Sequence, residues 1–235
     1  MSDVAVLHIR GIRKQYHALR PLRLNALIIG RGERVALAGF DAGAAEVFVD
    51  LVTGASLPDE GEVRVLGRST ASIADGNEWL ASLDRFGIVT PRAVLLDVAT
   101  LRQNLAMPLT LSIDPLPDAA ASRVAELAAE LEIATEWLDQ PIARVPAAVT
   151  ARAHLARAIA LDPTLLILEH PTVPLAPGER RPFGETVARA AAARNLATII
   201  ISEDADFAAA AAERRYTLQP ATGDLKPARR RFFGI

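Results

Sequence analysis

The segment of residues 34–54 constrains the fold of this chain more than any other part. A short apolar run at residues 35–38 leads into a turn of small residues at 39–45, and a helical pattern follows. This is the strand, turn and helix order of a phosphate-binding loop, in which backbone N–H groups at the start of the helix cradle a triphosphate. We therefore expect an α/β nucleotide-binding fold.

The same segment lacks the charged groups that phosphate binding requires. Ala45 stands where a phosphate-binding loop places its lysine, and Glu46 stands where the hydroxyl that holds magnesium belongs. Loss of the lysine removes a charge-assisted contact of roughly 1.5–3 kcal/mol, and the carboxylate adds repulsion. A simpler interpretation of Glu46 is that it begins the helix, where a carboxylate suits the helix dipole. Either way, the sequence predicts a severe loss of triphosphate affinity.

Composition and charge exclude several classes of protein and site. The chain has 235 residues, of which 51% are hydrophobic, enough to bury a full core. A net charge of −2 offers no basic field for nucleic acid. The absence of cysteine excludes disulfides, thiolate metal sites and a cysteine nucleophile. The sequence has neither a secretory signal pattern nor an apolar run of the roughly 20 residues that span a membrane, so we expect a soluble, cytoplasmic chain.

In the first part of the chain the sequence pattern changes from β-like to helical. Residues 4–9, 22–29 and 62–67 are β-like runs, which indicate an antiparallel edge sheet. From about residue 98 to 149 the pattern becomes helical, with a proline-rich interruption at 114–117. We interpret this stretch as a helical lobe inserted into a single domain of residues 1–235.

The C-terminal part returns to the pattern of a core. A helix is expected at residues 150–161, a buried strand at 165–168, an alanine-rich helix at 185–194 and another buried strand at 198–201. Apolar strands separated by helices favour a parallel sheet. The basic run at residues 229–233 is typical either of a solvated terminus or of a contact with lipid headgroups or a partner.

The order of these segments resembles the ATP-binding cassette (ABC) family, the nucleotide-binding subunits of ABC transporters, over nearly the whole chain. The spacing from Gly39 to Gly54 matches that from the first P-loop glycine to the glycine closing its helix. Residues 155–172 resemble the helix after the family's signature motif and its Walker B strand, and 101–109 resemble the start of its helical subdomain. The resemblance implies a P-loop NTPase-like cassette with a parallel-sheet core, an antiparallel β edge subdomain and an inserted helical lobe.

Most positions that carry the family's chemistry hold a different residue here. By the resemblance, the Walker B aspartate becomes Glu169, the catalytic glutamate becomes His170 and the switch histidine becomes Glu203. The magnesium-sensing glutamine falls on Pro91, and the signature LSGGQ falls on residues 145–149, which read Val-Pro-Ala-Ala-Val. The positions implied for residual nucleotide binding, with Tyr16 where an aromatic stacks on adenine, are Tyr16, Gly39, Gly43, Ala44, Ala45, Glu46 and Val47.

These exchanges together predict an inactive enzyme. ABC sites are composite, with the P-loop and Walker B from one subunit and the signature from the other, and this chain departs from the family in both halves. Phosphoryl transfer depends on positioned charge and metal, so we expect negligible hydrolysis, no intact catalytic residue and no metal site. Glu169 and His170 are adjacent but lack a third ligand. No cofactor is expected, although weak binding of ATP and magnesium stays open.

Three hypotheses follow from these observations. The first, which we favour, is a degenerate cassette that acts as a structural or regulatory subunit at the cytoplasmic face of the inner or plasma membrane. It would dock to a membrane permease through the groove between core and helical lobe, and pair with itself or with another cassette. The second is a working ATPase with altered motifs, in which His170 assists as a base. The third is a cassette-like adaptor without a transporter. The cargo and the direction of transport stay open.

Overall fold

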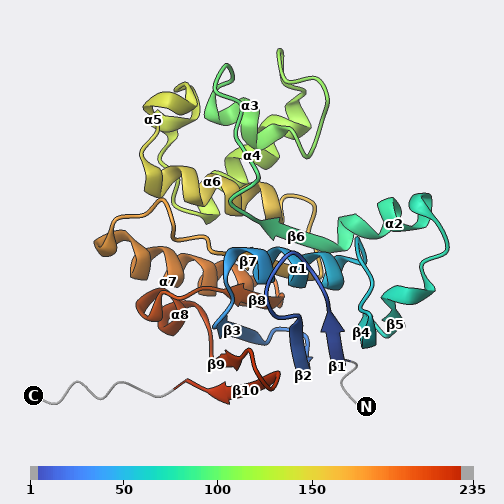
Figure 1. The fold of residues 1–235 in the computed structure, drawn as a ribbon. Coiled ribbons are helices and arrows are strands. Elements are labelled where there is room, and N and C mark those ends of the chain that lie inside the picture. Colours follow the sequence, from blue (N-terminus) through green and yellow to red (C-terminus); the bar gives the residue numbers. More distant parts are fainter. Residues whose placement is uncertain (1–4, 229–235) are drawn as a thin grey trace, which may run out of the picture.

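The centre of the molecule is a six-stranded sheet (Figure 1). The computed structural model describes residues 5–228, so the basic run at 229–233 lies outside the described part. All neighbouring strands pair in parallel except β10 and β9, which pair antiparallel. In sheet order the strands are β10 (Asp224–Pro227), β9 (Arg214–Gln219), β3 (Arg34–Ala38), β8 (Ala197–Ile201), β7 (Leu165–Glu169) and β6 (Phe86–Val89).

Alternate residues of the central strands face two separate cores, because successive side chains of a strand point to opposite faces. On β7, Leu166 and Leu168 pack with the helical side of the molecule, whereas Leu165 and Ile167 pack toward α1 (Ala42–Thr53) and the second sheet. Every residue of β7 and of β8 is buried. The nearly continuous apolar runs at these strands are thus explained by burial on both faces, as expected for a parallel sheet.

The second sheet is antiparallel and has four strands. In sheet order they are β2 (Leu22–Ile29), β1 (Leu7–Lys14), β4 (Glu60–Val65) and β5 (Arg68–Ser69). The prediction ended the first strand at residue 9, but the structure continues it to Lys14, which pairs with Leu22. Gly61 belongs to β4 and not to the turn before it; its φ is +84°, and a Cβ there would lie 2.3 Å from the carbonyl oxygen of Gly11.

The helices of the core begin earlier than the sequence pattern predicted. α6 (Ala147–Ile159) starts three residues before the expected position, and α7 (Pro177–Ala193) starts eight residues before it. Glycine and proline in the first turns of α7 are poor helix formers, which hid its start. Packing outweighs this propensity, since the ring of Phe183 stacks on Phe207 of α8 (Ala205–Ala211) with centroids 5.6 Å apart.

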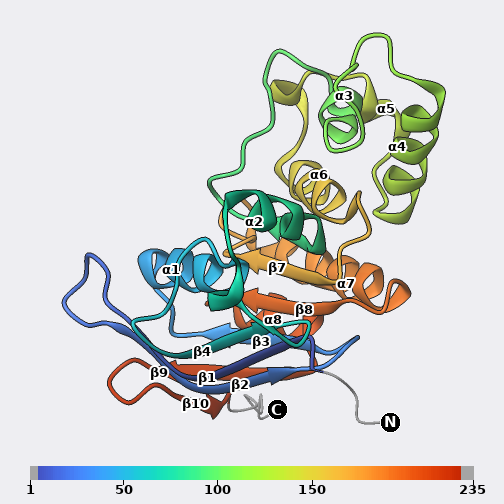
Figure 2. The same ribbon diagram turned by 90° about the vertical axis from the view of Figure 1, so that its right-hand side faces the viewer.

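The remaining helices lie together on the side of α6 that faces away from the sheet (Figure 2). They are α3 (Leu101–Ala106), α4 (Asp118–Glu130) and α5 (Thr135–Leu138). Another helix, α2 (Gly76–Ser82), follows β5, and the short 3-10 turns are η1 (Thr70–Ser72), η2 (Leu83–Arg85) and η3 (Ile142–Arg144). Among residues 5–228, none of the helices has the length and apolar character needed to cross a membrane.

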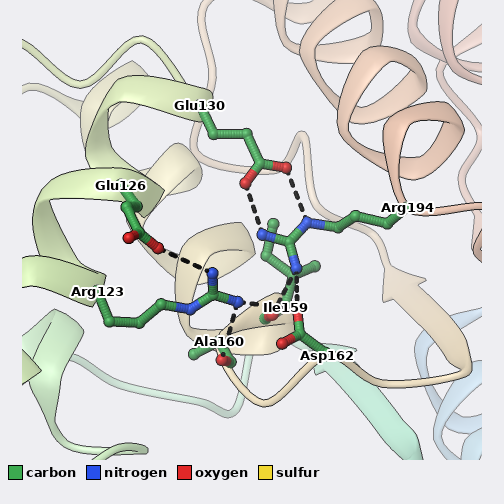
Figure 3. Close-up of polar contacts among 7 residues, drawn as sticks. All are labelled: Arg123, Glu126, Glu130, Ile159, Ala160, Asp162 and Arg194. Atoms are coloured by element: carbon green, nitrogen blue, oxygen red, sulfur yellow. Dashed lines mark hydrogen bonds and ion pairs between the residues drawn. The ribbon is translucent and has the colours of Figure 1, made fainter. Parts of the chain in front are cut away.

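A network of ion pairs ties α4 to the ends of α6 and α7 (Figure 3). Arg194, at the end of α7, donates from Nε to Glu130 of α4 at 2.8 Å and also pairs with Asp162, in the turn after α6. Arg123 of α4 donates to the same carboxylate of Asp162 at 2.8 Å. The Arg194 side chain is only 15% exposed, and bidentate pairs of this kind are stronger than ordinary surface pairs. The network therefore fixes the helical segment against the core.

Candidate nucleotide-type site

The turn between β3 and α1 has the backbone that the sequence pattern predicted. Gly39 has a φ of +85°, and a Cβ at this position would lie 2.7 Å from the carbonyl oxygen of Leu218. Asp41 caps α1, since its carboxylate accepts a hydrogen bond from the N–H of Ala44 at 2.8 Å. The helix ends at Gly54 in the left-handed conformation. The strand, turn and helix predicted for residues 34–54 are thus confirmed.

The structure places Ala45 and Glu46 on different sides of α1. Ala45 is fully buried in the core between the sheets, whereas the side chain of Glu46 is exposed at 50%. The interpretation of Glu46 as the residue that begins the helix is wrong. Asp41 holds the cap position and the first turn contains no acidic residue, because the helix begins at Ala42 and Glu46 follows in its second turn. Glu46 therefore requires another explanation.

That explanation is Arg92, a residue that the sequence analysis did not single out. Its guanidinium donates two parallel hydrogen bonds to Glu169, from Nη1 to Oε1 and from Nη2 to Oε2, both at 2.8 Å. Its Nε lies 3.5 Å from Oε1 of Glu46. The side chain of Glu169, at the end of β7, is 2% exposed. A carboxylate so deeply buried requires a cation or several donors, and a glutamate next to an apolar strand is the signal that could have led to Arg92.

The charges around this pair shift the titration of their neighbours. Burial raises the pKa of Asp50, one turn after Glu46 on α1, and the charge of Glu46 raises it further, whereas Arg92 lowers it. Burial lowers the pKa of Arg92, but its hydrogen bond to Glu169 and the surrounding carboxylates raise it by more, so the net shift is upward. One guanidinium is thus surrounded by carboxylates from α1 and β7.

The two other positions of the implied catalytic group lie beside β8. Glu203 follows the strand, and its Oε1 accepts a hydrogen bond from the N–H of Gly39 at 2.6 Å. His170 follows β7 with a φ of +43°, and its backbone N–H donates to the carbonyl of Ile201 at 2.8 Å. Its Nε2 is buried and has no hydrogen-bond partner within the described part of the chain. In residues 5–228, no group of three or more histidine, aspartate or glutamate side chains is arranged to hold a metal ion.

Tyr16 lies beside the first turn of α1. A Cβ added to Gly43 would lie 3.2 Å from Cε2 of its ring. Burial and the charge of Asp41 both raise the pKa of the Tyr16 hydroxyl. A pocket of about 470 Å³ opens here, and its lining includes Tyr16, Arg20, Arg23, Gly39, Asp41 and Pro220. The structure therefore brings Tyr16 close to Gly39 and Gly43. The half-buried Val47 packs against the core between the two sheets.

A loop of residues 90–100 leads from β6 to α3 and presents apolar side chains to solvent. Val94 is 70% exposed and Val98 is 97% exposed. The backbone of the loop is held by buried and half-buried side chains: Asn104 bonds both the N–H and the carbonyl of Leu96, and Arg157 donates to the carbonyl of Val94 at 2.9 Å. Arg92 belongs to this loop, so the site and the exposed apolar residues lie in one segment.

The residues at the implied signature position lie at the start of α6. Pro146 occupies the N-cap and offers no side-chain hydrogen bond to the helix. Ala147 is the first helical residue, and burial in the helix begins fully at Ala151. The position therefore presents only apolar side chains.

Comparisons with known proteins identify sequence relatives of the chain. No family model matches the chain. Among curated proteins, the phosphonates import ATP-binding protein PhnC of Anaeromyxobacter dehalogenans is 29% identical over 197 residues, which are 81% of this chain and 39% of that protein. The methionine import ATP-binding protein MetN of Brucella abortus is 24% identical over 213 residues, 91% of this chain and 57% of that protein. The chain thus spans less than two thirds of the length of these relatives. The lipoprotein-releasing system ATP-binding protein LolD 1 of Rhodopseudomonas palustris is 25% identical over 73% of this chain and 77% of its own length.

Solved structures agree on the architecture. The dimeric ATP-binding cassette MJ0796, in a post-hydrolysis state bound to ADP and Pi, matches with a TM-score of 0.77 at 18% identity and covers 97% of this chain and 100% of that chain. The structure of cbiO1 from Clostridium perfringens, part of the transporter complex cbiONQ, matches with a TM-score of 0.79 at 19% identity, covering 94% and 87%. The predicted fold class is therefore confirmed.

Proposed function

Because the chain has the fold of an ABC cassette and is similar in sequence to ATP-binding subunits of ABC transporters, we propose that it is a catalytically impaired subunit of this kind. In this proposal it has a structural or regulatory role and docks to a membrane permease. It pairs there with a second copy or with another cassette. The cargo stays open.

The observation that carries the proposal is the alanine at position 45, where the resemblance implies a lysine. By the resemblance, a lysine from this position reaches the phosphates, and here Ala45 is fully buried and has no charge. The next residue is a carboxylate, and the N–H of Gly39 is bonded to a second carboxylate, that of Glu203. A triphosphate entering this turn would find no lysine, and it would have to displace the carboxylate of Glu203 from the N–H of Gly39. Both effects weaken its binding.

The residues also do not fit the magnesium ion that accompanies ATP in such sites. Magnesium requires oxygen ligands in octahedral geometry and keeps several waters. Here both oxygens of Glu169 already accept hydrogen bonds from Arg92, and the position implied for the hydroxyl ligand is Glu46, close to the same guanidinium. Pro91 offers no side-chain oxygen. These positions therefore do not form a ligand set for magnesium.

The docking part of the proposal is supported by the region between β6 and the helical segment. A groove of about 300 Å³ lies there. Its lining includes Phe86 and Ile88 of β6, His154 of α6, Leu161 in the turn after α6, and Pro108 in the segment after α3. The loop of residues 90–100 runs beside it and exposes Val94 and Val98. The lining combines apolar side chains with Asp84, His154 and Arg157, and such a groove next to exposed apolar side chains suits a short amphipathic segment of a partner.

We expect the purified chain to release phosphate from Mg-ATP at the background rate of the buffer. Positioned charge and metal supply nearly all of the acceleration in phosphoryl transfer, and the residues implied for both are replaced. The measurement is a phosphate-release assay at saturating ATP, with Glu169→Gln as the matched variant. A rate above background that Glu169→Gln abolishes would contradict the proposal and favour a working ATPase with altered motifs.

A further inference from the structure

Arg92 and Glu169 form an ion pair in which one partner is buried and the other reaches solvent. The side chain of Glu169 is 2% exposed and that of Arg92 is 43% exposed. The carboxylate would be costly to bury alone, because an ionised group loses its hydration in the interior. The bidentate geometry satisfies both of its oxygens with one guanidinium, which is the pairing that arginine makes best.

The guanidinium lies where three elements meet. Arg92 comes from the loop after β6, Glu169 from the end of β7, and Glu46 from α1, whose next turn carries Asp50. The charge of Arg92 acts on Asp50 as well as on the two carboxylates that it contacts. A divalent cation drawn to these carboxylates would have to displace the guanidinium, with which it shares the sign of charge.

We propose that Arg92 is a built-in cation, whose guanidinium takes the place of a bound divalent metal and fastens the loop of residues 90–100 to β7 and α1 without any ligand. The inference deepens the proposed function, because it explains how the loop keeps one conformation when the site holds neither nucleotide nor metal. Arg92 is thus a positioning residue for the exposed apolar side chains that follow it.

The loop is suited to such a role because it is also held further along. Arg157 binds the carbonyl of Val94, and the fully buried Asn104 binds Leu96. Arg92 supplies the first attachment, nearest to the sheet. Loss of that attachment frees the start of the loop while the later attachments stay.

The test is thermal unfolding of the full chain at fixed ionic strength, with magnesium chloride or EDTA as the only probes. The midpoint of the wild type should be the same in both. Arg92→Ala should lower the midpoint by roughly 10 °C, because a buried charge loses its partner. Arg13→Ala is the matched control, since Arg13 pairs with Glu60 at 2.8 Å with side chains that are 44% and 63% exposed. This control should shift the midpoint by no more than about 3 °C.

Two further variants separate a built-in cation from a merely structural arginine. Arg92→Ala/Glu169→Gln should recover much of the lost midpoint, since it removes the buried charge together with its partner. Magnesium should raise the midpoint of Arg92→Ala but not that of the double variant. The proposal is wrong if the double variant is no more stable than Arg92→Ala, or if magnesium stabilises the wild type as much as Arg92→Ala. These readouts involve no nucleotide, so a chain that hydrolyses ATP would overturn the proposed function without deciding this test.

Discussion

We expect Asn104→Ala to lower the free energy of unfolding by about 2–4 kcal/mol, because it leaves several polar groups of the loop without partners. The side chain of Asn104 is fully buried. Its Oδ1 accepts from the N–H of Leu96 at 2.7 Å, and its Nδ2 donates to the carbonyls of Leu96 and Thr100 at 3.1 and 3.0 Å. Urea denaturation measures the loss, and amide hydrogen exchange locates it. Exchange should accelerate most at residues 90–100.

Asn25→Ala is the control for this variant. Asn25 also makes two side-chain hydrogen bonds, to the carbonyl of Thr222 and to Asp224, but they are exposed to solvent. Water replaces such bonds, so the expected loss is below about 1 kcal/mol. If the two variants lose the same stability, burial of Asn104 does not hold the loop. Under the proposed function, in which the loop of residues 90–100 takes part in docking, Asn104→Ala should also reduce association of the chain with the membrane fraction of cells that contain its permease.

Gly87→Ala should destabilise the fold by more than about 3 kcal/mol. Gly87 lies in β6, and a Cβ there would come within 2.3 Å of the carbonyl oxygen of Ala158 on α6 and 3.0 Å of the ring of Pro163. A backbone atom cannot move aside as a flexible side chain does, so either α6 or β6 must shift. The measurement is again the urea midpoint, with circular dichroism to establish that the variant folds.

The matched control for Gly87→Ala is Gly178→Ala, in the first turn of α7. Nothing lies within 4 Å of a Cβ at Gly178. Alanine favours a helix over glycine by roughly 0.5–1 kcal/mol, so this variant should be neutral or more stable. Equal destabilisation of both variants would show that the close approach of β6 and α6 is not what excludes a side chain at Gly87.

The sequence predicted those parts of the fold that depend on local pattern. The apolar runs of β7 and β8 and the glycine turn before α1 are short-range signals, and the structure confirms them. The start of α7 was missed because Pro182 and its neighbouring glycines disfavour a helix locally, whereas packing of Phe183 on Phe207 stabilises it.

The candidate site was predictable only in part, because its central contact joins residues far apart in the sequence. The exchanges at Ala45, Glu46 and Glu169 are visible from the chain alone by the resemblance to a known family. The pairing of Arg92 with Glu169 spans 77 positions, and no periodic pattern links a loop arginine to a strand carboxylate at that distance. The sequence does indicate that Glu169 has a cationic partner, because a glutamate directly after a buried strand is rarely left unpaired. It does not indicate which arginine or lysine that partner is.

The measurement that tests the central claim most directly is calorimetric titration of the purified chain with Mg-ATP. The account predicts no binding tighter than about 1 mM, because Ala45 and Glu46 replace the lysine and the hydroxyl and because the carboxylate of Glu203 occupies the N–H of Gly39. The control is Ala45→Lys/Glu46→Ser, which restores the cation and the hydroxyl and should gain affinity if it folds. Binding of Mg-ATP to the wild type clearly tighter than millimolar would contradict the account.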